Sequence, residues 1–344
     1  MERGEKIHGL YVGVTGIDVI FHMKSDLPGK NEKKTVRDFE MQIGGPAAKA
    51  AMTCAALGGK ATLMTCIGDS AQGRMMKAEL AEQGIDVIDL VQRGIDVTDL
   101  AQRGTDVTGL AREDFPVPNI SAVFLDEAAG TRTVVSGQHS LQDISLPGSV
   151  GWGNDRCCDD CVDDYDQCLR DYDYCLYDCN LQDLTPDITA ALAAADVPLI
   201  LDCGSWKQNI EDALSHAQIA ISSSVFTSPE GKNIFDLQVE CGIPAAARTN
   251  EGDPIEYSVA GDIGLFGQKM DTGTPGESLV TGTIPVQKLD SGITIGAGDV
   301  LHGAFCYYHM HERKAVVDVL SCAARFATEY VRTGRLLNVR TGEI

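Results

Sequence analysis

Short apolar runs alternate with helix-forming segments along the first part of this chain, and this alternation restricts the fold more than any other feature. The run "IHGLYVGVTGIDVIFHM" (7–23) begins as a strand-like apolar run, and "DFEMQIGGPAAKAAMTCAALGG" (38–59) turns through two glycines into a helix of small residues. "KATLMTCIGD" (60–69) then predicts a strand and "SAQGRMMKAELAEQGI" (70–85) a helix. This rhythm favours a parallel sheet covered by helices.

The same rhythm returns in the second half of the chain. "VPLILDCGSW" (197–206) and "IAISSS" (219–224) predict buried strands, and "KQNIEDALSHA" (207–217) predicts the helix between them. We therefore expect the sheet to continue into the C-terminal third of the chain.

Composition excludes several classes of protein. With 344 residues, 44% of them apolar, the chain can bury a sizeable core. A formal net charge of −22 would repel a phosphate backbone, so we expect no nucleic-acid partner. No stretch reaches the roughly 18 consecutive apolar residues that a membrane span needs, and "MERGEKIHGL" is too charged to lead a signal peptide. We expect a cytoplasmic protein without a membrane partner.

A ten-residue unit is repeated three times in residues 84–113, as "GIDVIDLVQR", "GIDVTDLAQR" and "GTDVTGLARE". Each copy has an Asp at an N-cap position and is followed by a Gly or ends near one, which predicts one short helical turn per copy. The period is too short for the common solenoid classes. We interpret the repeat as a local duplication tolerated at the surface, in preference to a binding array.

Half of the twelve cysteines lie in the aspartate-rich segment 157–180. Four of them follow a helical period that would place a stripe of thiols on one helix face: Cys161, Cys168, Cys175 and Cys179. We expect reduced thiols, because a chain with its own core does not need a disulfide framework. A solvated insertion is the favoured interpretation. The alternative is a zinc site with these four ligands: Cys158, Cys161, Cys175 and Cys179.

A glycine-rich turn followed by a helix is the clearest candidate site. In "ITIGAGDVLHGAF" (293–305) the residues Gly296, Ala297 and Gly298 precede apolar residues at helical spacing. Glycines at this place leave the first N–H groups of the helix unobstructed, and the helix dipole adds positive charge, so a phosphate can bind. Asp299 would lie in the first helical turn beside this anion site. The motif alone fits a catalytic carboxylate and an ordinary N-cap residue equally well.

The glycine turn is the last of several motifs that resemble, in order, the ribokinase-like (PfkB) family of carbohydrate kinases, which includes adenosine kinase and ketohexokinase. The others are "GLYVGVTGIDVIF", "IGGPAAKAAMTCAALGGKATLMTCIGDSAQGRMMKAELAEQGIDV", "NISAVFLDEAAGTRTVV", "LILDCGSWK" and "ARTNEGDPI". Among subfamilies, "GGPAAKAA", "LDCGSWK" and "GAGDVLHGAFCYY" look most like bacterial sugar kinases near ketohexokinase.

The resemblance implies a three-layer α/β/α fold with a mostly parallel central sheet and a small β-strand lid. It implies a single kinase domain over residues 1–344, with the lid at approximately 19–42 and 119–136. Residues of approximately 94–113 and 151–173 are insertions relative to the family, and we expect residues 94–113 and 157–173 to lie outside the main core.

The resemblance also implies site residues. In the family the position of Asp299 is the catalytic base and the turn before it is the anion hole, which suits a reaction that needs positioning and charge stabilisation. The catalytic set is therefore Asp299, Gly296, Ala297 and Gly298. The substrate-binding set is Asp18, Gly44, Gly45 and Lys49. The nucleotide-binding set is Thr249, Gly252, Gly296 and Gly298.

Without the resemblance these residues have plainer interpretations. Asp18 is then an ordinary residue on a strand, and Gly44 and Gly45 form a helix-entry turn. "TNEGDPI", which contains Thr249 and Gly252, is a simple turn. Arg132, in "GTRT", stands where the family's lid tends to carry a polar residue.

Two single positions and one motif depart from the family pattern. Lys49 replaces a usual substrate-binding Asn, and Ile293 replaces an Asp that is linked to a monovalent-cation site. The Asn and Glu of the magnesium-associated motif are not evident in "SSSVFTSPEG". Glu230 is the residue of this stretch that could take the place of the motif's acidic residue. We assign no metal-ligating residue, and the departures predict reduced activity or altered substrate choice.

The function with most support is an ATP-dependent phosphotransferase, with Mg²⁺, that phosphorylates a hydroxyl of a small sugar. A non-catalytic sugar- or nucleotide-binding pseudokinase and an adenosine-like nucleoside kinase are the alternatives on the same fold. Retention of "GAGD" favours an enzyme, because a binder does not need the base. The resemblance further implies a homodimer that forms through the lid.

Overall fold

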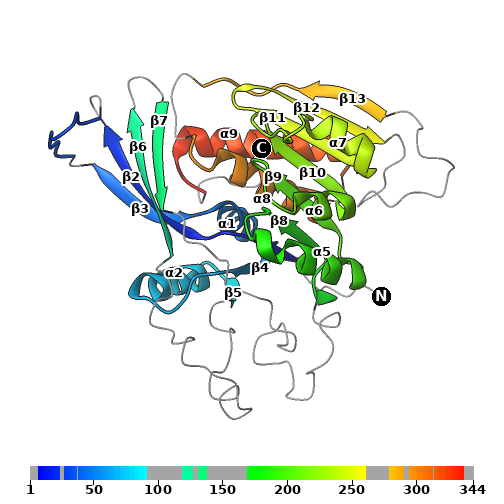
Figure 1. The fold of residues 1–344 in the computed structure, drawn as a ribbon, viewed down its shortest axis with the longest axis horizontal. Coiled ribbons are helices and arrows are strands. Elements are labelled where there is room, and N and C mark those ends of the chain that lie inside the picture. Colours follow the sequence, from blue (N-terminus) through cyan, green and yellow to red (C-terminus); the bar gives the residue numbers. More distant parts are fainter. Residues whose placement is uncertain are drawn as a thin grey trace, which may run out of the picture.

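Two sheets organise the described part of the chain (Figure 1). The computed structural model describes residues 7–23, 27–36, 38–90, 118–126, 131–137, 169–260, 279–289, 294–312 and 314–336. Elements carry the labels of Figure 1, whose numbering has gaps.

Nine strands form the main sheet in the order β13-β12-β11-β10-β9-β8-β1-β4-β5. Their bounds are β1 His8–Val12, β4 Lys60–Thr65, β5 Ile85–Asp89, β8 Tyr174–Tyr177, β9 Leu199–Cys203, β10 Ile219–Ser223, β11 Ala245–Asn250, β12 Asp253–Ala260 and β13 Leu279–Ile284. In this order, neighbouring strands from β11 through β1 to β5 pair in parallel, and β12 and β13 add an antiparallel edge. The prediction of a mostly parallel central sheet is confirmed.

Helices cover both faces of the main sheet. Those on one face are α1 Pro46–Ala56, α2 Ala71–Glu82, α8 Ala297–Glu312 and α9 Val316–Thr333. Those on the other are α5 Thr185–Ala194, α6 Ile210–His216 and α7 Ile234–Cys241, after a short 3₁₀ turn at Gln182–Leu184. Because both faces are covered, central strands such as β9 are apolar along most of their length and fully buried. The expected three-layer α/β/α fold is confirmed.

Strand order reverses beside β1. From β1 the chain builds β4 and β5 on one side, whereas β8 to β11 extend the sheet on the other. Ligands of open α/β sheets bind outside the carboxyl ends of the strands at such a reversal. Gly13 follows β1 and Asp178 follows β8, so both lie at this point of the fold.

The second sheet stands beside the main one (Figure 1) and has the order β3-β2-β6-β7. Its strands are β2 Gly16–Met23, β3 Phe39–Gly44, β6 Asn119–Asp126 and β7 Thr131–Gly137. This is the small strand lid that the family resemblance implied. One of its faces packs Ile20, Val123 and Leu125 against Ile295, which lies directly before the glycine turn.

Two predictions for the unusual segments are wrong where the structure describes them. The first copy of the repeat contains strand β5 and is not a helical turn, because Ile85–Asp89 pairs in parallel with β4 and buries Ile85 and Ile88. The pattern "IDVID" alternates well enough to serve as an edge strand once a neighbouring strand is present. The remaining copies lie outside the described residues.

The predicted thiol-bearing helix is also wrong for its C-terminal part. Tyr174–Tyr177 is strand β8, inserted between β1 and β9, so Cys175 is fully buried in the middle of the sheet. Cys179 follows the strand with a positive φ of 56° and is also buried. Leu169, which fell within the segment expected to lie outside the core, packs into it. Cys158, Cys161 and Cys168 lie outside the described residues.

Within the described part of the chain, none of the helices has the length and apolar character needed to cross a membrane.

Candidate active site

The glycine turn and the start of α8 have the geometry that the sequence predicted. Gly296 has a φ of +75°, a left-handed conformation that favours glycine, and α8 begins at Ala297. Asp299 lies in the first turn of the helix. The space where a Cβ of Gly298 would point contains no atom within 4 Å. The N-terminal N–H groups of α8 can therefore be approached by an anion.

Close packing of α1 against α8 brings a second helix to this turn. A Cβ at Gly303 would lie only 2.3 Å from the carbonyl oxygen of Ala50, so glycine is required for the two helices to approach this closely. As a result, Lys49 reaches the glycine turn from α1. A Cβ at Gly296 would lie 2.6 Å from Lys49 Cδ and 2.8 Å from Lys49 Nζ.

Asp18 and Lys49 form a buried ion pair. Lys49 Nζ donates to Asp18 Oδ2 at 3.2 Å, and the side chains are 5% and 14% exposed. A Cβ at Gly44 would lie 2.4 Å from the Asp18 carboxylate, so only glycine allows the backbone to approach it. Gly45 has a φ of +99° and serves as the N-cap of α1. The structure thus brings together the four predicted substrate-binding residues.

Asp299 is a partly buried carboxylate among other charges. Burial is the main cause that raises its pKa from 3.8 to about 6, and the charge of Asp202 adds to this effect. The charges of Lys49 and His302 lower the pKa, and that of Asp18 raises it slightly. A carboxyl group with a pKa near 6 is ionised at neutral pH yet is a better proton acceptor than an ordinary Asp.

Asp202 and His302 were not predicted from the sequence. His302 Nδ1 lies 2.7 Å from the Gly298 carbonyl oxygen and 3.5 Å from Asp202 Oδ2, and Nε2 lies 3.3 Å from the Ile221 carbonyl oxygen. Both ring nitrogens of His302 therefore lie within hydrogen-bonding distance of a carbonyl oxygen, which acts as an acceptor. Burial raises the pKa of Asp202, and the charge of His302 opposes that rise. The sequence did contain a signal for both residues, because Asp202 lies near the end of a buried strand and His302 follows Asp299 by about one helical turn.

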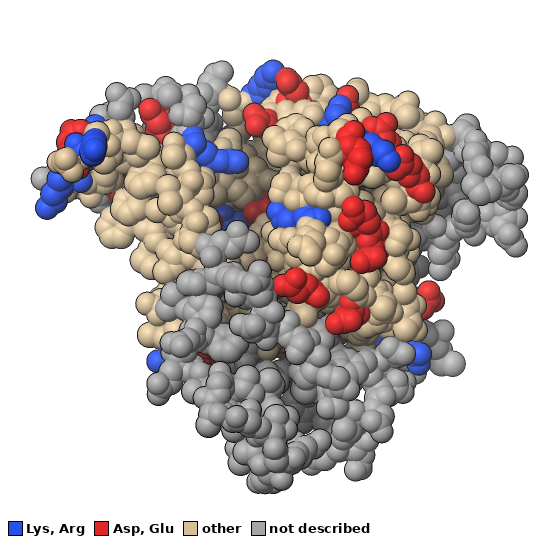
Figure 2. Space-filling view, viewed as in Figure 1, with Lys and Arg blue, Asp and Glu red and all other residues tan. Residues whose placement is uncertain are grey.

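We refer to Asp18, Lys49, Asp202, Asp299 and His302 as the α8 cluster. In Figure 2 the surface is hollowed between the region over the second sheet and the region over the main sheet, and acidic and basic side chains are visible in the hollow. The cluster thus combines three carboxyl groups with one lysine and one histidine.

Asp178 is a further buried carboxyl group that the sequence did not single out. Its Oδ2 accepts from the backbone N–H of Val14 at 2.9 Å and of Ala47 at 3.3 Å, and its Oδ1 accepts from Asn180 N–H at 2.9 Å. Burial outweighs these bonds and raises the pKa of Asp178 to about 7. Asp178 fastens the end of β8 to the β1–β2 loop and to the N-terminus of α1, and so supports the positions of Asp18 and Lys49.

The glycine turn is held from α9 and from the second sheet. The Tyr330 hydroxyl of α9 donates to the Ile295 carbonyl oxygen at 2.9 Å. Arg132 of β7, exposed on the second sheet, donates to Thr294 Oγ1 at 3.1 Å. These contacts fix the residues immediately before Gly296. Ile293, the predicted departure from the cation motif, lies outside the described residues.

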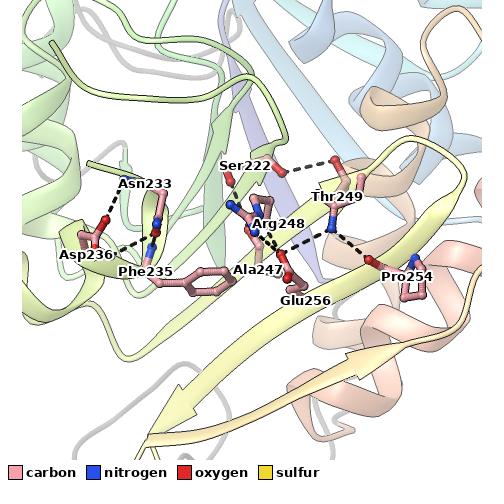
Figure 3. Close-up of polar contacts among 10 residues, drawn as sticks. Ser222, Asn233, Phe235, Asp236, Ala247, Arg248, Thr249, Pro254 and Glu256 are labelled. Carbon is pink, nitrogen blue, oxygen red and sulfur yellow. Dashed lines mark hydrogen bonds and ion pairs between the residues drawn. The ribbon is translucent and has the colours of Figure 1, made fainter. Parts of the chain in front are cut away.

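Thr249 lies near the end of β11 (Figure 3), and Gly252 lies in the turn between β11 and β12. Thr249 Oγ1 donates to the Ser222 carbonyl oxygen at 3.2 Å, one residue beyond the Ile221 carbonyl that His302 contacts. This turn is therefore joined to the α8 cluster through strand β10. Among the described residues no contact places Gly252 in that cluster, and the nearest atom to a Cβ added at Gly252 would be Lys288 Cγ at 3.8 Å.

Polar side chains beside this turn form a second group, the β11–β12 cluster, which comprises Arg248, Thr249, Asn250 and Glu256. Arg248 pairs with Glu256, with Nε 2.7 Å from Oε2, and its guanidinium lies 5.6 Å from the centre of the Phe235 ring (Figure 3). Asn250 Nδ2 donates to the Pro254 carbonyl oxygen at 3.0 Å and lies 3.4 Å from the same Glu256 oxygen. These contacts stiffen the start of the turn at a partly exposed surface.

Glu230 lies apart from both clusters as far as its described contacts show. It accepts from Ser228 Oγ at 2.9 Å and precedes α7, and this hydrogen bond is the main reason that its pKa is lowered. The described residues contain no group of three or more His, Cys, Asp or Glu side chains arranged to hold a metal ion.

The N-terminal part of the chain is similar to a known protein family. Residues 10–109 match the model of the pfkB family carbohydrate kinases. This segment includes Asp18, the diglycine and Lys49.

Solved structures with the same fold span nearly the whole chain. A microbiome-derived acarbose kinase has a TM-score of 0.66 at 14% identity, covering 96% of this chain and 93% of its own. An Arabidopsis thaliana ribokinase complexed with ribose and ATP has a TM-score of 0.61 at 16% identity, covering 97% and 99%. A Methanocaldococcus jannaschii nucleoside kinase of the ribokinase family has a TM-score of 0.60 at 12% identity, covering 97% and 95%. The chain thus has the ribokinase-like fold.

Proposed function

From its ribokinase-like fold and the pfkB match over residues 10–109, we propose that this protein is an ATP-dependent kinase that phosphorylates a hydroxyl of a small sugar. The observation that carries the proposal is the position of Asp299, in the first turn of α8 behind a left-handed Gly296 and within one cluster with Asp18. A base and an anion site on one helix terminus are what phosphoryl transfer requires.

The reaction follows from these positions. The Asp299 carboxylate accepts the proton of the acceptor hydroxyl, and the oxygen of that hydroxyl forms the new bond to the γ-phosphorus. The bond from the γ-phosphorus to the bridging oxygen breaks, and ADP leaves with the electron pair. N–H groups of the Gly296 to Gly298 turn stabilise the charge of the phosphoryl group during transfer. Asp18 accepts hydrogen bonds from other hydroxyls of the sugar and orients it.

Two parts of the site are suited to bind ATP. The turn before α8 offers N–H groups and a helix dipole to an anion, and the Lys49 ammonium lies against the same turn. The β11–β12 turn with Thr249 and Gly252 would hold the nucleoside part. Mg²⁺ in kinases is bound largely through phosphate oxygens, so we propose that it enters with ATP and neutralises phosphate charge.

A screen for ADP release tests the function directly. The full chain is supplied with ATP and Mg²⁺ and a panel of sugars and nucleosides, and release is measured by a coupled assay. We expect turnover with a small sugar. Turnover with nucleosides alone would move the assignment to a nucleoside kinase, for which the fold of the M. jannaschii enzyme is a precedent. ATP binding without turnover on any acceptor would indicate a non-catalytic binder.

We also propose that two copies associate through the second sheet. Its outer face carries exposed apolar side chains, with Phe39 57%, Met41 54% and Val135 61% exposed, and the Phe21 ring stacks on those of Phe39 and Phe124. Light scattering should report a dimer in solution that Met41→Glu converts to a monomer. A monomeric wild-type protein would contradict the proposal.

A further inference from the structure

Lys49 is a buried cation at a position where the family resemblance led us to expect a neutral Asn. It lies in the first turn of α1, with its backbone N–H bonded to the Gly45 carbonyl oxygen at 3.0 Å. Its side chain is 5% exposed. A buried ammonium group is costly unless nearby groups compensate its charge, so its neighbours indicate what it does.

The described contacts of Lys49 use part of its hydrogen-bonding capacity. An ammonium group has three N–H donors. Among the described residues, the hydrogen-bond acceptor of Nζ is Asp18 Oδ2 at 3.2 Å, a rather long distance for a charged pair. Two donors therefore remain for other partners within this site.

The position of Nζ over the glycine turn indicates which partner that is. The space that a Cβ of Gly296 would occupy lies 2.6 Å from Lys49 Cδ and 2.8 Å from Nζ, so the end of the side chain covers the turn that starts α8. The N–H groups of this turn are the proposed anion hole. A cation in contact with the same turn can reach the same anion.

The charges around Lys49 support this assignment. Asp18 of β2 pairs with it, and Asp299 of α8 is close enough for the Lys49 charge to lower the pKa of its carboxyl group. Asp202 of β9 and His302 of α8 also act on Asp299, with opposite signs. Tyr330 of α9 is also near these groups, and burial raises its pKa, with smaller contributions from the charges of Asp299, Asp18 and Glu40. The ammonium group thus pairs with the carboxylate proposed to orient the sugar, and its charge acts on the carboxylate proposed as base.

We propose that Lys49 is a catalytic residue whose ammonium group contacts the phosphoryl group as it passes from ATP to the sugar hydroxyl, while its bond to Asp18 aligns the sugar. This inference rests on the proposed kinase function. In the transfer, the P–O bond to the sugar oxygen forms, the bond to the ADP oxygen breaks, and the proton goes to Asp299. Lys49 stays protonated and stabilises the negative charge on the transferred group.

A binding experiment tests the contact without turnover. Lys49→Met keeps the length of the side chain and removes its charge, and Lys49→Arg restores a charge. Titration calorimetry compares ADP with a non-hydrolysable β,γ-imido analogue of ATP, each with Mg²⁺. We expect Lys49→Met to weaken binding of the analogue about tenfold or more and that of ADP much less, because ADP has no γ-phosphate. Lys49→Arg should recover part of the difference.

Kinetics provide the second readout. Removing a donor that stabilises transition-state charge typically lowers kcat by about 10²–10³. We expect Lys49→Met to lose about that much kcat, with a much smaller change in the KM for sugar. The acidic limb of its pH–rate profile should also move to higher pH, because the Lys49 charge lowers the pKa of Asp299. Lys60→Met, at the exposed start of β4, is the matched control and should behave as wild type.

The outcomes separate the two proposals. Absence of nucleotide binding by the wild-type protein overturns the kinase function and the role of Lys49 with it. Wild-type binding with an unchanged preference for the ATP analogue over ADP in Lys49→Met overturns only the role of Lys49. If Lys49→Met does not fold because Asp18 is left unpaired, the double variant Asp18→Asn/Lys49→Met removes both charges and must show the same loss of preference.

Discussion

The α8 cluster and the β11–β12 cluster differ in how deeply their charges are buried. In the α8 cluster, Asp18 and Lys49 are 14% and 5% exposed, whereas the Arg248–Glu256 pair of the β11–β12 cluster has side chains 29% and 37% exposed. Water can replace a lost partner at an exposed pair, but a buried charge that loses its partner stays uncompensated. Substitutions in the α8 cluster should therefore have much larger effects.

The difference also concerns the backbone. In the α8 cluster, glycines allow contacts that any side chain would block, as between Gly44 and Asp18 and between Gly303 and Ala50. Around Gly252 of the β11–β12 turn, the nearest atom to an added Cβ is 3.8 Å away. The first region needs exact backbone placement, whereas the second tolerates adjustment. Measured effects of substitutions in the two clusters can therefore confirm or remove this contrast.

The largest expected effect is that of Asp299→Asn. Asn keeps the size and N-capping ability of Asp but cannot accept the proton, and loss of a general base typically costs about 10²–10⁴ in rate. We expect most turnover to be lost, with nucleotide binding nearly unchanged and no fall in the melting temperature. Coupled ADP release and thermal melting measure both.

The control for Asp299→Asn is Asp318→Asn, which changes an exposed acidic residue in the first turn of α9. It should retain wild-type turnover. Equal turnover in Asp299→Asn and wild type would show that Asp299 is an ordinary residue at a helix N-terminus.

The second-largest effect is expected in the pH dependence of the rate. Because burial and Asp202 raise the pKa of Asp299 to about 6, the base is lost to protonation below that pH. The rate should fall about tenfold per pH unit below about pH 6 and level off above it. An acidic limb near pH 4 would mean that the Asp299 carboxyl group behaves as if it were solvated.

Raising the pH through the pKa of Asp299 increases the rate but lowers the stability of the folded protein. The folded-state pKa of Asp299 lies above its ordinary value of 3.8, so the folded protein binds more protons than the unfolded chain between about pH 4 and 6. The contribution of this group to stability is present below pH 4 and is lost as pH rises through 6. Urea unfolding at pH 4 and pH 7 should show Asp299→Asn gaining stability relative to wild type at the higher pH.

A smaller effect is expected of Tyr330→Phe. The variant removes the hydroxyl that holds the Ile295 carbonyl oxygen and leaves that buried oxygen without its partner. The loss should cost about 1–3 kcal/mol of folding free energy. The turn before α8 should also loosen, so that kcat falls several-fold. Urea unfolding and steady-state kinetics measure the two effects, and a wild-type kcat would mean that this hydrogen bond does not position the turn.

The smallest effect is expected in the β11–β12 cluster. Thr249→Val removes one partly exposed hydrogen bond, from Thr249 Oγ1 to the Ser222 carbonyl oxygen. Such a bond contributes about 0.5–1.5 kcal/mol, so the KM for ATP should rise by no more than about tenfold while kcat stays within a factor of two. A loss of kcat as large as that of Asp299→Asn would remove the contrast between the two clusters.

Local patterns in the sequence were sufficient to predict much of the fold. The strands of β1, β4, β9 and β10 and the helices α1, α2 and α6 coincide with runs whose period is visible in the chain. The glycine turn with Asp299 was equally visible, because an unobstructed helix N-terminus depends on neighbouring residues alone. The segments that were misjudged are β5 and β8. Each has a pattern that fits more than one structure, and a paired strand on the sheet decided between them.

The sequence by itself determined a parallel α/β fold and the type of chemistry at the start of α8, because period, glycine placement and helix dipole are local properties. Only the tertiary structure decided which charges meet there. Lys49 reaches Gly296 because α1 and α8 touch at Gly303, and Asp202 reaches His302 because β9 ends beside α8. Distances between charges far apart in the chain depend on packing, and packing sets the burial that gives the Asp299 carboxyl group its pKa near 6.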